Sequence, residues 1–449
     1  MKRAILVFSL TLWIALAALP LLAAGDDAAQ GRERTRQVLL YGIDSEVLDV
    51  VQKLKATGES SFAAELAQIL AEKRGAEVRR TILELFADTK GKEGEQAASA
   101  ILRAWQDEPP EVVVAAVQYL SAIAAEGRAP LLAPLAESPL AAVSSSAIRA
   151  LGGTRDPAAA DLLLKLLDRP DMAEADRTGI ILALGEAGDR RAVAALLSIA
   201  KNRDEDKVRR MYAADSLGKL GDPSALPVLR DMFGEKDALV RAYAASGLAH
   251  FDVEEAFPQL LAGLKDENWK VRAECARAFA RPLSEARSAE ALPVLSYKAE
   301  LDPTPQVRLE AIRALGAIGG EKSNALLIGL YRSRTSTLAA REESLAILVR
   351  TALPAGLEAV RAVVAEEWKA VDQKVVQMTA RVLSTAASPQ ARDLLVKFLD
   401  SPNPVVRIYG VRGIASARLA DLRERIRGLA EKDPHPAVQR EAAKALEKL

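Results

Sequence analysis

Apolar residues recur at helical spacing in a segment that repeats along the chain. In its clearest copy, Val307, Ala311 and Leu315 follow one another at intervals of four residues, which places them on one face of a helix. A Val-Arg pair opens this segment, and it returns at Val78, Val208, Val240, Val271 and Val406, and as Val438-Gln439. Together with Val307, these valines lie 130, 32, 31, 36, 99 and 32 residues apart. One period of about 31 to 36 residues fits every interval, which predicts a solenoid of stacked repeats.

Each repeat holds a first helix, a turn and the Val-Arg helix. In one unit a helix begins at Ala225-Leu226, and Val240 to Leu248 forms the second helix. The joint before it, Gly221-Asp222-Pro223, suits a helix end, a cap and a first helical turn in that order. The pattern predicts an all-α, right-handed α-solenoid of about twelve antiparallel helix pairs over residues 59–449. Residues 26–58 do not follow the spacing of the repeats. They are predicted to form capping helices, with Asp44 as an N-cap.

Two features of the Val-Arg helix concern packing. Alanines at positions such as Ala311 and Ala314 allow neighbouring helices to approach closely. An acidic residue stands five or six positions before the valine, where it can cap the helix or meet the arginine of its own or the next repeat. These acids are Glu235, Asp266, Asp302, Asp400 and Asp433. We therefore interpret Arg241, Arg272, Arg308 and Arg407 as structural.

The segment 213–229 and the Val-Arg helices resemble the HEAT repeat, in particular the short bacterial form known as the phycobilisome-lyase-like HEAT repeat. The resemblance covers residues from about 60 to 449. It implies a scaffold that the family uses mainly to bind other macromolecules, while some members are enzymes. Deoxyhypusine hydroxylases of this fold carry repeated His-Glu pairs for a di-iron centre. Here Phe251 follows His250 and Pro436 follows His435, so that ligand set is missing.

The amino terminus has the pattern of a secretory signal peptide. Lys2-Arg3 precedes an uncharged apolar run up to Ala24, and Asp26-Asp27 follows. Pro20 and the small residues near Ala23-Ala24-Gly25 favour a cleaved signal, residues 1–25, over a retained anchor. We therefore expect an exported protein, periplasmic or secreted, with no membrane span after cleavage. Its single cysteine, Cys275, excludes an intramolecular disulfide and is expected to be a buried core residue.

The charge balance limits the classes of partner that the chain is expected to bind. Lys plus Arg and Asp plus Glu both number 61, so no global field attracts nucleic acid. The exposed face of the Val-Arg helices is the candidate binding surface. In the last six repeats, the residue six positions after the valine is Arg277, Arg313, Ala346, Arg381, Arg412 or Lys444. This basic stripe either receives an acidic partner or is neutralised by Glu274, Glu310 and Glu441, which stand three residues earlier.

Aromatic residues mark the same face. Tyr212, Tyr243, Met378 and Tyr409 take the place of Glu310 in other repeats, either as a protein-binding surface or as packing at the edge of the core. The tryptophans, including Trp269 in a predicted turn, are assigned to packing on the outer surface or between repeats.

The sequence thus predicts a non-catalytic, monomeric scaffold that binds protein or peptide partners and needs no cofactor. The predicted binding residues are Tyr212, Tyr243, Tyr409, Arg277, Arg313, Arg381 and Arg412. Two alternatives stay open: a bilin-lyase-like enzyme on the same repeat, and a purely structural spacer.

Overall fold

Helices account for all the regular secondary structure among the residues that this computed structural model describes, which are 25–72, 74–370 and 373–449. The all-α prediction is confirmed. The predicted signal peptide, residues 1–25, lies outside the described residues except for Gly25. None of the described helices combines the length and the apolar character that crossing a bilayer requires.

The chain divides into two compact units, Met1–Asp189 and Arg190–Leu449. The described part of unit 1 contains α1 (Gly25–Tyr41), α2 (Asp44–Thr57), α3 (Ala63–Ala71), α4 (Ala76–Thr89), α5 (Glu95–Arg103), η1 (Trp105–Asp107), α6 (Pro110–Ala122), α7 (Ala129–Ala136), α8 (Ala141–Gly152), α9 (Pro157–Leu167) and α10 (Glu174–Ala187). Here and below, η marks a short 3₁₀ helix.

Unit 2 continues the same alternation of helices. It contains η2 (Arg190–Ala192), α11 (Val193–Lys201), α12 (Lys207–Leu220), η3 (Pro223–Ala225), α13 (Leu226–Phe233), α14 (Ala238–Leu248), α15 (Val253–Gly263), α16 (Trp269–Ala278), α17 (Glu285–Leu301), α18 (Pro305–Ile318), α19 (Gly320–Arg332), α20 (Leu338–Thr351), α21 (Leu353–Glu367), α22 (Lys374–Ser384), η4 (Pro389–Ala391), α23 (Arg392–Leu399), α24 (Pro404–Ser416), η5 (Ala420–Leu422), α25 (Arg423–Lys432) and α26 (Pro436–Leu446).

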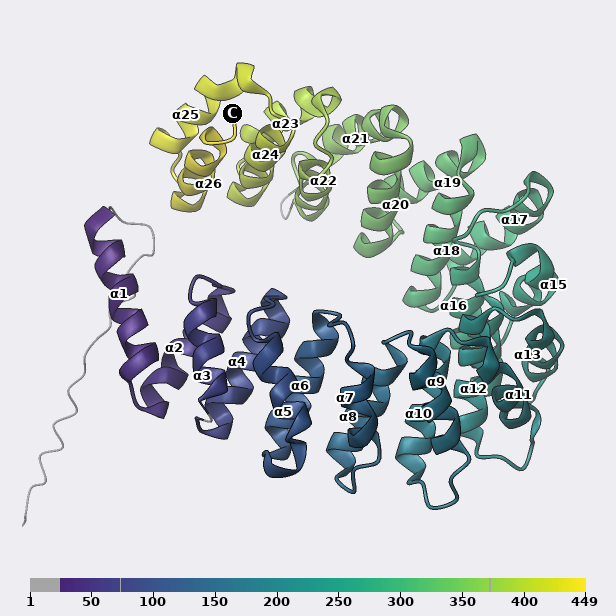
Figure 1. Ribbon diagram of the computed structural model, residues 1–449. Coiled ribbons are helices and arrows are strands. Elements are labelled where there is room, and N and C mark those ends of the chain that lie inside the picture. Colours follow the sequence, from purple (N-terminus) through teal and green to yellow (C-terminus); the bar gives the residue numbers. More distant parts are fainter. Residues whose placement is uncertain (1–24, 73, 371–372) are drawn as a thin grey trace, which may run out of the picture. The chain divides into compact units, whose positions relative to one another are not determined.

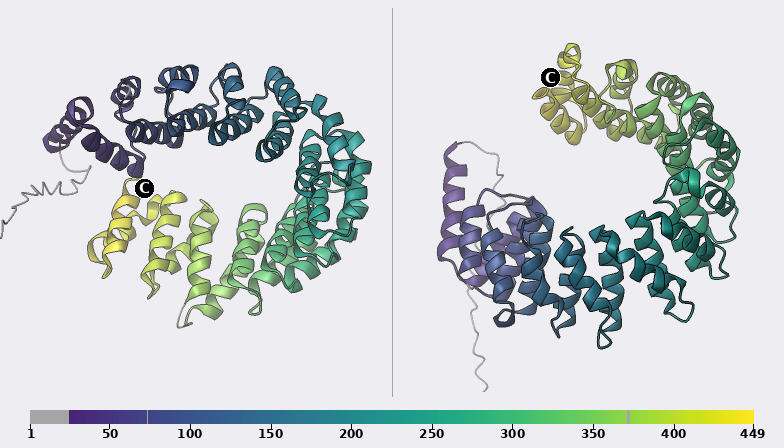
Figure 2. Two further views of the ribbon diagram at one scale, coloured as in Figure 1. Left: turned by 90° about the horizontal axis from the view of Figure 1, so that it is seen from below. Right: turned by 45° about the vertical axis from the view of Figure 1, so that its right-hand side comes forward.

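Within each unit, an odd-numbered helix packs against the even-numbered helix that follows it, and each even-numbered helix also packs against the next even-numbered one. In unit 2 the even-numbered helices lie on the inner side of the stack (Figure 1). Figure 2 shows from two further directions that successive pairs of unit 2 stand side by side. This arrangement is the predicted α-solenoid, in which every repeat buries its apolar face against its neighbours.

The joint between α12 and η3 has the predicted chemistry. Gly221 adopts a left-handed conformation (φ 61°) that ends α12. The Asp222 carboxylate accepts a hydrogen bond from the Ser224 amide (3.0 Å), and Pro223 opens the next turn. The chain therefore reverses between repeats without leaving the first donor of the new helix unpaired.

The predicted cap of α2 is wrong by one residue. Ile43 is the N-cap, and its amide donates to the Glu46 carboxylate (3.1 Å). Asp44 instead accepts from the amide of Gly75 (2.9 Å), immediately before α4. Asp44 therefore ties two successive even-numbered helices together, which helix-cap statistics along one helix do not reveal.

The predicted register is also wrong in α12. Counting from the N-cap, the buried valine of an even-numbered helix is its third residue and the arginine its fourth, as with Val240 and Arg241 after Asp237 in α14. In α12 the N-cap is Asp206, so Arg209 and Arg210 take these places. Val208 is 40% exposed because it lies one position before the core face. The Val-Arg pair at 208 is thus a coincidence of sequence.

Candidate functional site

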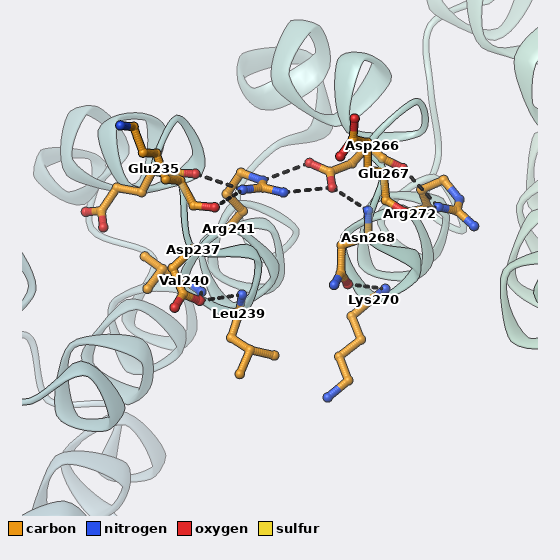
Figure 3. Close-up of polar contacts among 11 residues, drawn as sticks. Glu235, Asp237, Leu239, Val240, Arg241, Asp266, Glu267, Asn268, Lys270 and Arg272 are labelled. Carbon is orange, nitrogen blue, oxygen red and sulfur yellow. Dashed lines mark hydrogen bonds and ion pairs between the residues drawn. The ribbon is translucent and has the colours of Figure 1, made fainter.

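A ladder of buried and half-buried arginines joins successive repeats on the turn side of the even-numbered helices. Arg241 donates to the carbonyl oxygens of Glu235 and Lys236 in its own repeat (2.9 and 2.8 Å). It also donates through Nε and Nη2 to the Asp266 carboxylate of the following repeat (2.8 and 3.0 Å). Figure 3 shows Arg241 between these two groups and Arg272 in the same position one repeat later. We call this set the arginine ladder; it comprises Arg79, Arg210, Arg241, Arg272 and Arg407, paired with Glu108, Glu235, Asp266, Asp302 and Asp433.

The ladder confirms the structural role of Arg241, Arg272 and Arg407 and corrects the partner of each acid. The acid meets the arginine of the preceding repeat, not that of its own or the next one. Asp302 is fully buried. Burial alone would raise the pKa of its carboxyl, but the hydrogen bonds from Arg272 and from the Thr304 amide lower that pKa below its usual value. Asp400 departs from the pattern, because it pairs with Arg425 of α25.

An open groove of about 490 Å³ crosses α14, α16 and α18 on the inner side of unit 2. Its lining comes from Leu239, Ala242, Tyr243, Ser246, Trp269, Lys270, Ala273, Glu274, Arg277, Gln306 and Glu310. Two of the predicted binding residues, Tyr243 and Arg277, therefore line one concave surface, which we call the inner groove. Its volume lies in the range of sites that hold small molecules or short peptide segments.

Two close helix contacts flank the groove, one between α12 and α14 and the other between α18 and α20. A Cβ atom on Gly218 would lie 2.5 Å from the backbone of Gly247, so α12 and α14 touch near their carboxyl ends. Gly316 of α18 is in similarly close contact with Ile347 of α20. The groove is lined mainly by residues from the amino-terminal halves of its three helices, away from these contacts.

Tyr212 extends the aromatic side of the inner groove. Its ring meets that of Tyr243 edge to face, with centroids 5.5 Å apart and planes at 73°. Both tyrosines are half-buried. Burial raises the pKa of the Tyr243 hydroxyl, and the neighbouring Tyr212 and Asp215 raise it further, so this hydroxyl is neutral at physiological pH. The predicted neighbourhood of Tyr212 and Tyr243 on adjacent inner helices is thus present.

The four arginines of the basic stripe are all paired with carboxylates. Arg277 holds Glu274 (2.9 Å) and approaches Glu310 of the next inner helix (3.6 Å). Arg313 forms ion pairs with the same Glu310 (3.1 Å) and with Glu343 of α20 (3.0 Å). The neutralised alternative therefore describes this stretch, and the pairing extends between helices as well as within them. In α26, Glu441 bonds to Arg412 of the preceding inner helix (2.9 Å).

Glu274 is the carboxylate most affected by this crowding. Its side chain is 23% exposed. Burial raises the pKa of Glu274 above its usual range, and the Glu310 and Asp215 carboxylates raise it further, whereas Arg277 opposes the shift. Two carboxylates, Glu274 and Glu310, therefore lie close together in the lining of the inner groove, and Arg277 contacts both.

The remaining predicted residues lie elsewhere on the inner helices. Arg381 is on α22, five residues after the buried Val376 and not six, and it pairs with Glu342 of α20 (2.5 Å). Tyr409 and Arg412 lie on α24, with the guanidinium 5.8 Å from the ring centroid. These three residues do not contribute to the lining of the inner groove. Met378 follows the alternative of core packing, because its side chain is buried.

Trp269 is the groove residue that the sequence analysis missed. It is not in a turn: it is the first residue of α16, and it is 41% exposed at the lip of the inner groove. Lys270 lies 5.8 Å from the centroid of its ring. The available signal was Asn268, which caps α16 by accepting from the Lys270 amide (2.9 Å) and so marks Trp269 as the start of an inner helix.

Cys275 and His435 have structural positions. Cys275 is fully buried against Gly263, and burial raises the pKa of its thiol well above its usual range, which makes it inert. His435 caps α26, with its Nδ1 accepting from the Ala437 amide (3.3 Å). In the part of the chain that the structure describes, no group of three or more His, Cys, Asp or Glu side chains is placed to hold a metal ion.

The chain is similar to several solved structures. The chain is 21% identical to a chain of the CpcE and CpcF complex of phycocyanin lyase from Nostoc sp. PCC7120, over 53% of this chain and 94% of that one (TM-score 0.36). It is 20% identical to human deoxyhypusine hydroxylase over 67% and 99% (TM-score 0.28), and 13% identical to a chain in a structure of Kap95p with RanGDP over 93% and 66% (TM-score 0.48).

Sequence comparison identifies the family. Curated protein sequences gave no match. The family described as spirochaete HEAT repeat protein matches residues 39–445, which include all the helices from α2 to α25 and nearly all of α26. The match confirms the resemblance to the HEAT repeat that the Val-Arg helices indicate. The chain therefore belongs to the spirochaete HEAT repeat protein family.

Proposed function

We propose that the chain is an exported, non-catalytic scaffold that binds protein or peptide partners through the inner face of unit 2. The observation that carries this proposal is the inner groove, with Tyr243 and Trp269 at its wall and lip. Half-exposed aromatic side chains on a concave surface suit protein recognition, because they supply large apolar contact at a small cost in side-chain entropy. The arginine ladder holds the supporting helices in place, so the groove is preformed.

Loss of the tyrosine pair is expected to weaken partner capture strongly. Tyr212→Ala/Tyr243→Ala removes two rings from the groove wall, and each buried aromatic contact of this kind is worth roughly 1–2 kcal/mol, so recovery is expected to fall at least about tenfold. The measurement is quantitative mass spectrometry of proteins that co-purify with the chain from envelope fractions of the producing cell, followed by binding of the purified partner.

A matched control distinguishes specific binding at the inner groove from nonspecific binding. Tyr297 lies on α17, an odd-numbered helix, and is 57% exposed. Tyr297→Ala is expected to retain every partner that the wild-type chain retains. If the tyrosine pair and Tyr297 variants lose the same partners equally, or if neither loses any, the inner groove is not the binding surface. Circular dichroism of each variant checks that the helices are intact.

Export is the second part of the proposal, and the pattern of residues 1–25 supports it. Full-length chain produced in its native cells is expected outside the cytoplasm, with a mature amino terminus close to Asp26. A variant that lacks residues 2–25 is expected to stay in the cytoplasm. Cell fractionation with amino-terminal sequencing measures both. Recovery of the full-length chain with residues 1–25 intact in the cytoplasmic fraction would contradict export.

A further inference from the structure

We propose that the ligand of the inner groove is an extended, uncharged, proline-containing peptide segment in the polyproline II conformation. This inference rests on the proposed function and specifies its ligand. Three properties of the groove support it: the aromatic groups that line it, the balance of its charges, and the side-chain donors that border it.

The aromatic lining provides the apolar contact. Trp269 at the lip, Tyr243 in the wall and Leu239 beside them come from two neighbouring helices, α14 and α16. Proline rings pack on flat aromatic faces, and a polyproline II segment is already extended before it binds, so it loses little conformational entropy in such a groove. Trp269 is 41% exposed, so its ring is open to a ligand.

The charges of the lining balance. Lys270 and Arg277 face Glu274 and Glu310, which makes two cations and two anions. Arg277 already joins both carboxylates, at 2.9 and 3.6 Å. A strongly acidic ligand would meet the two carboxylates, and a strongly basic ligand would have to displace Arg277 from them. Charge complementarity therefore favours a ligand without net charge.

The hydrogen-bonding groups favour an extended backbone over a helical one. Three helix amino ends border the groove, marked by Leu239, Trp269 and Gln306 at the first or second position of α14, α16 and α18. The ends of α14 and α16 are already capped, because Asp237 accepts from the Leu239 and Val240 amides and Asn268 accepts from the Lys270 amide. Lys270 and Gln306 therefore supply the donors of the groove through their side chains. A polyproline II segment keeps all its carbonyl oxygens free to accept such bonds, whereas an α-helix uses its own internally.

The test uses two fluorescein-labelled synthetic peptides and the full mature chain. One peptide contains three Pro-Pro-Leu units and the other contains three Ala-Ala-Leu units, both with blocked termini. Fluorescence anisotropy is expected to show the proline peptide binding at least about tenfold more tightly than the alanine peptide. Raising the salt concentration from 50 to 300 mM is expected to change this affinity less than about twofold, since no net charge is recognised.

Variants locate the binding. Trp269→Ala is expected to weaken the proline peptide by about tenfold or more, as for a tryptophan hot spot, while Trp269→Phe, which keeps a ring, retains most of the affinity. Tyr297→Ala on α17 is the matched control and is expected to bind like the wild type. Equal binding of the two peptides, steep loss of binding with salt, or equal effects of Trp269→Ala and Tyr297→Ala would each overturn the inference.

The result also distinguishes this inference from the proposed function. If the proline peptide does not bind while a co-purified partner still depends on Tyr212 and Tyr243, the scaffold function stands and the ligand class is wrong. If the proline peptide binds through Trp269 and the tyrosine pair has no effect on partner capture, the groove binds a peptide but does not carry the main partner.

Discussion

Replacing Arg272 by methionine is expected to destabilise unit 2 by about 3–5 kcal/mol, because the change leaves the carboxylate of Asp302 buried without its main partner. Arg272 is 7% exposed and Asp302 is fully buried. Their two hydrogen bonds measure 2.8 and 2.9 Å, and Arg272 also satisfies the carbonyl oxygens of Asp266 and Glu267. Urea unfolding followed by circular dichroism measures the change in the free energy of unfolding.

Two control variants distinguish the destabilisation caused by an unpaired buried charge from that caused by the loss of packing. Arg272→Met/Asp302→Asn removes both charges and is expected to recover a large part of the loss. Arg308→Met removes a half-buried arginine whose hydrogen bond goes to the neutral carbonyl of Asp302 (2.6 Å), so about 0.5–1.5 kcal/mol is expected. An equal effect of Arg272→Met and Arg308→Met would show that the ion pair contributes nothing beyond an ordinary hydrogen bond.

The same pair sets the acid limit of the fold. Burial alone would raise the pKa of Asp302, but Arg272 and the Thr304 amide lower it below its unfolded value. Its contribution to stability is therefore complete above the unfolded pKa and is lost as the pH falls through the folded pKa. In Arg272→Met the burial is opposed only by weaker partners such as Lys298 (3.3 Å), so the pKa rises and acid unfolding is expected to begin at a higher pH.

Gly218→Ala is expected to destabilise unit 2 by about 1–3 kcal/mol, although alanine is the better helix former. The new methyl group would lie 2.5 Å from both the Cα atom and the carbonyl oxygen of Gly247. Both of these are backbone atoms, so the clash cannot be relieved by a side-chain rotation, and α12 must move away from α14. The shift is also expected to change the inner groove, which α14 helps to line.

Gly428→Ala is the matched control for this glycine. Gly428 is in α25, is exposed, and a Cβ atom there would meet nothing within 4 Å. The same substitution is expected to stabilise the protein by about 0.5–1 kcal/mol. Urea unfolding of both variants measures the two effects. If Gly218→Ala were as stabilising as Gly428→Ala, close contact between the backbones of α12 and α14 would be excluded.

Much of the fold could be predicted from local rules, and the errors in that prediction have physical causes. The buried faces of the inner helices follow from the spacing of Val307, Ala311 and Leu315, all fully buried. The slip at Val208 arose because a Val-Arg pair was matched by its letters, whereas the cap at Asp206 fixes the register. Counting from the cap would have identified Arg210 as the arginine that pairs with Glu235.

The candidate site was predictable only in part. The placement of Tyr212 and Tyr243 on adjacent inner helices follows from the period, and so does the pairing of Glu274 with Arg277 inside one helix. The pairing of Arg277 with Glu310 and of Arg313 with Glu343 joins different repeats. It depends on the offset between neighbouring helices, which the contacts at glycines such as Gly218 influence and which no spacing along the chain expresses.

The sequence by itself determined the repeat, the helix pairs, the buried faces and the arginines that join them, because these depend on helical periodicity and capping within about 35 residues. Only the tertiary structure decided that four of the five acids meet the arginine of the preceding repeat, that four arginines of the basic stripe are paired with carboxylates, and that Trp269 and Tyr243 line one groove. These features depend on the distance between neighbouring helices and on their offset along the helix axis. Side-chain contacts between repeats set both quantities, and the order of residues along one helix does not contain them.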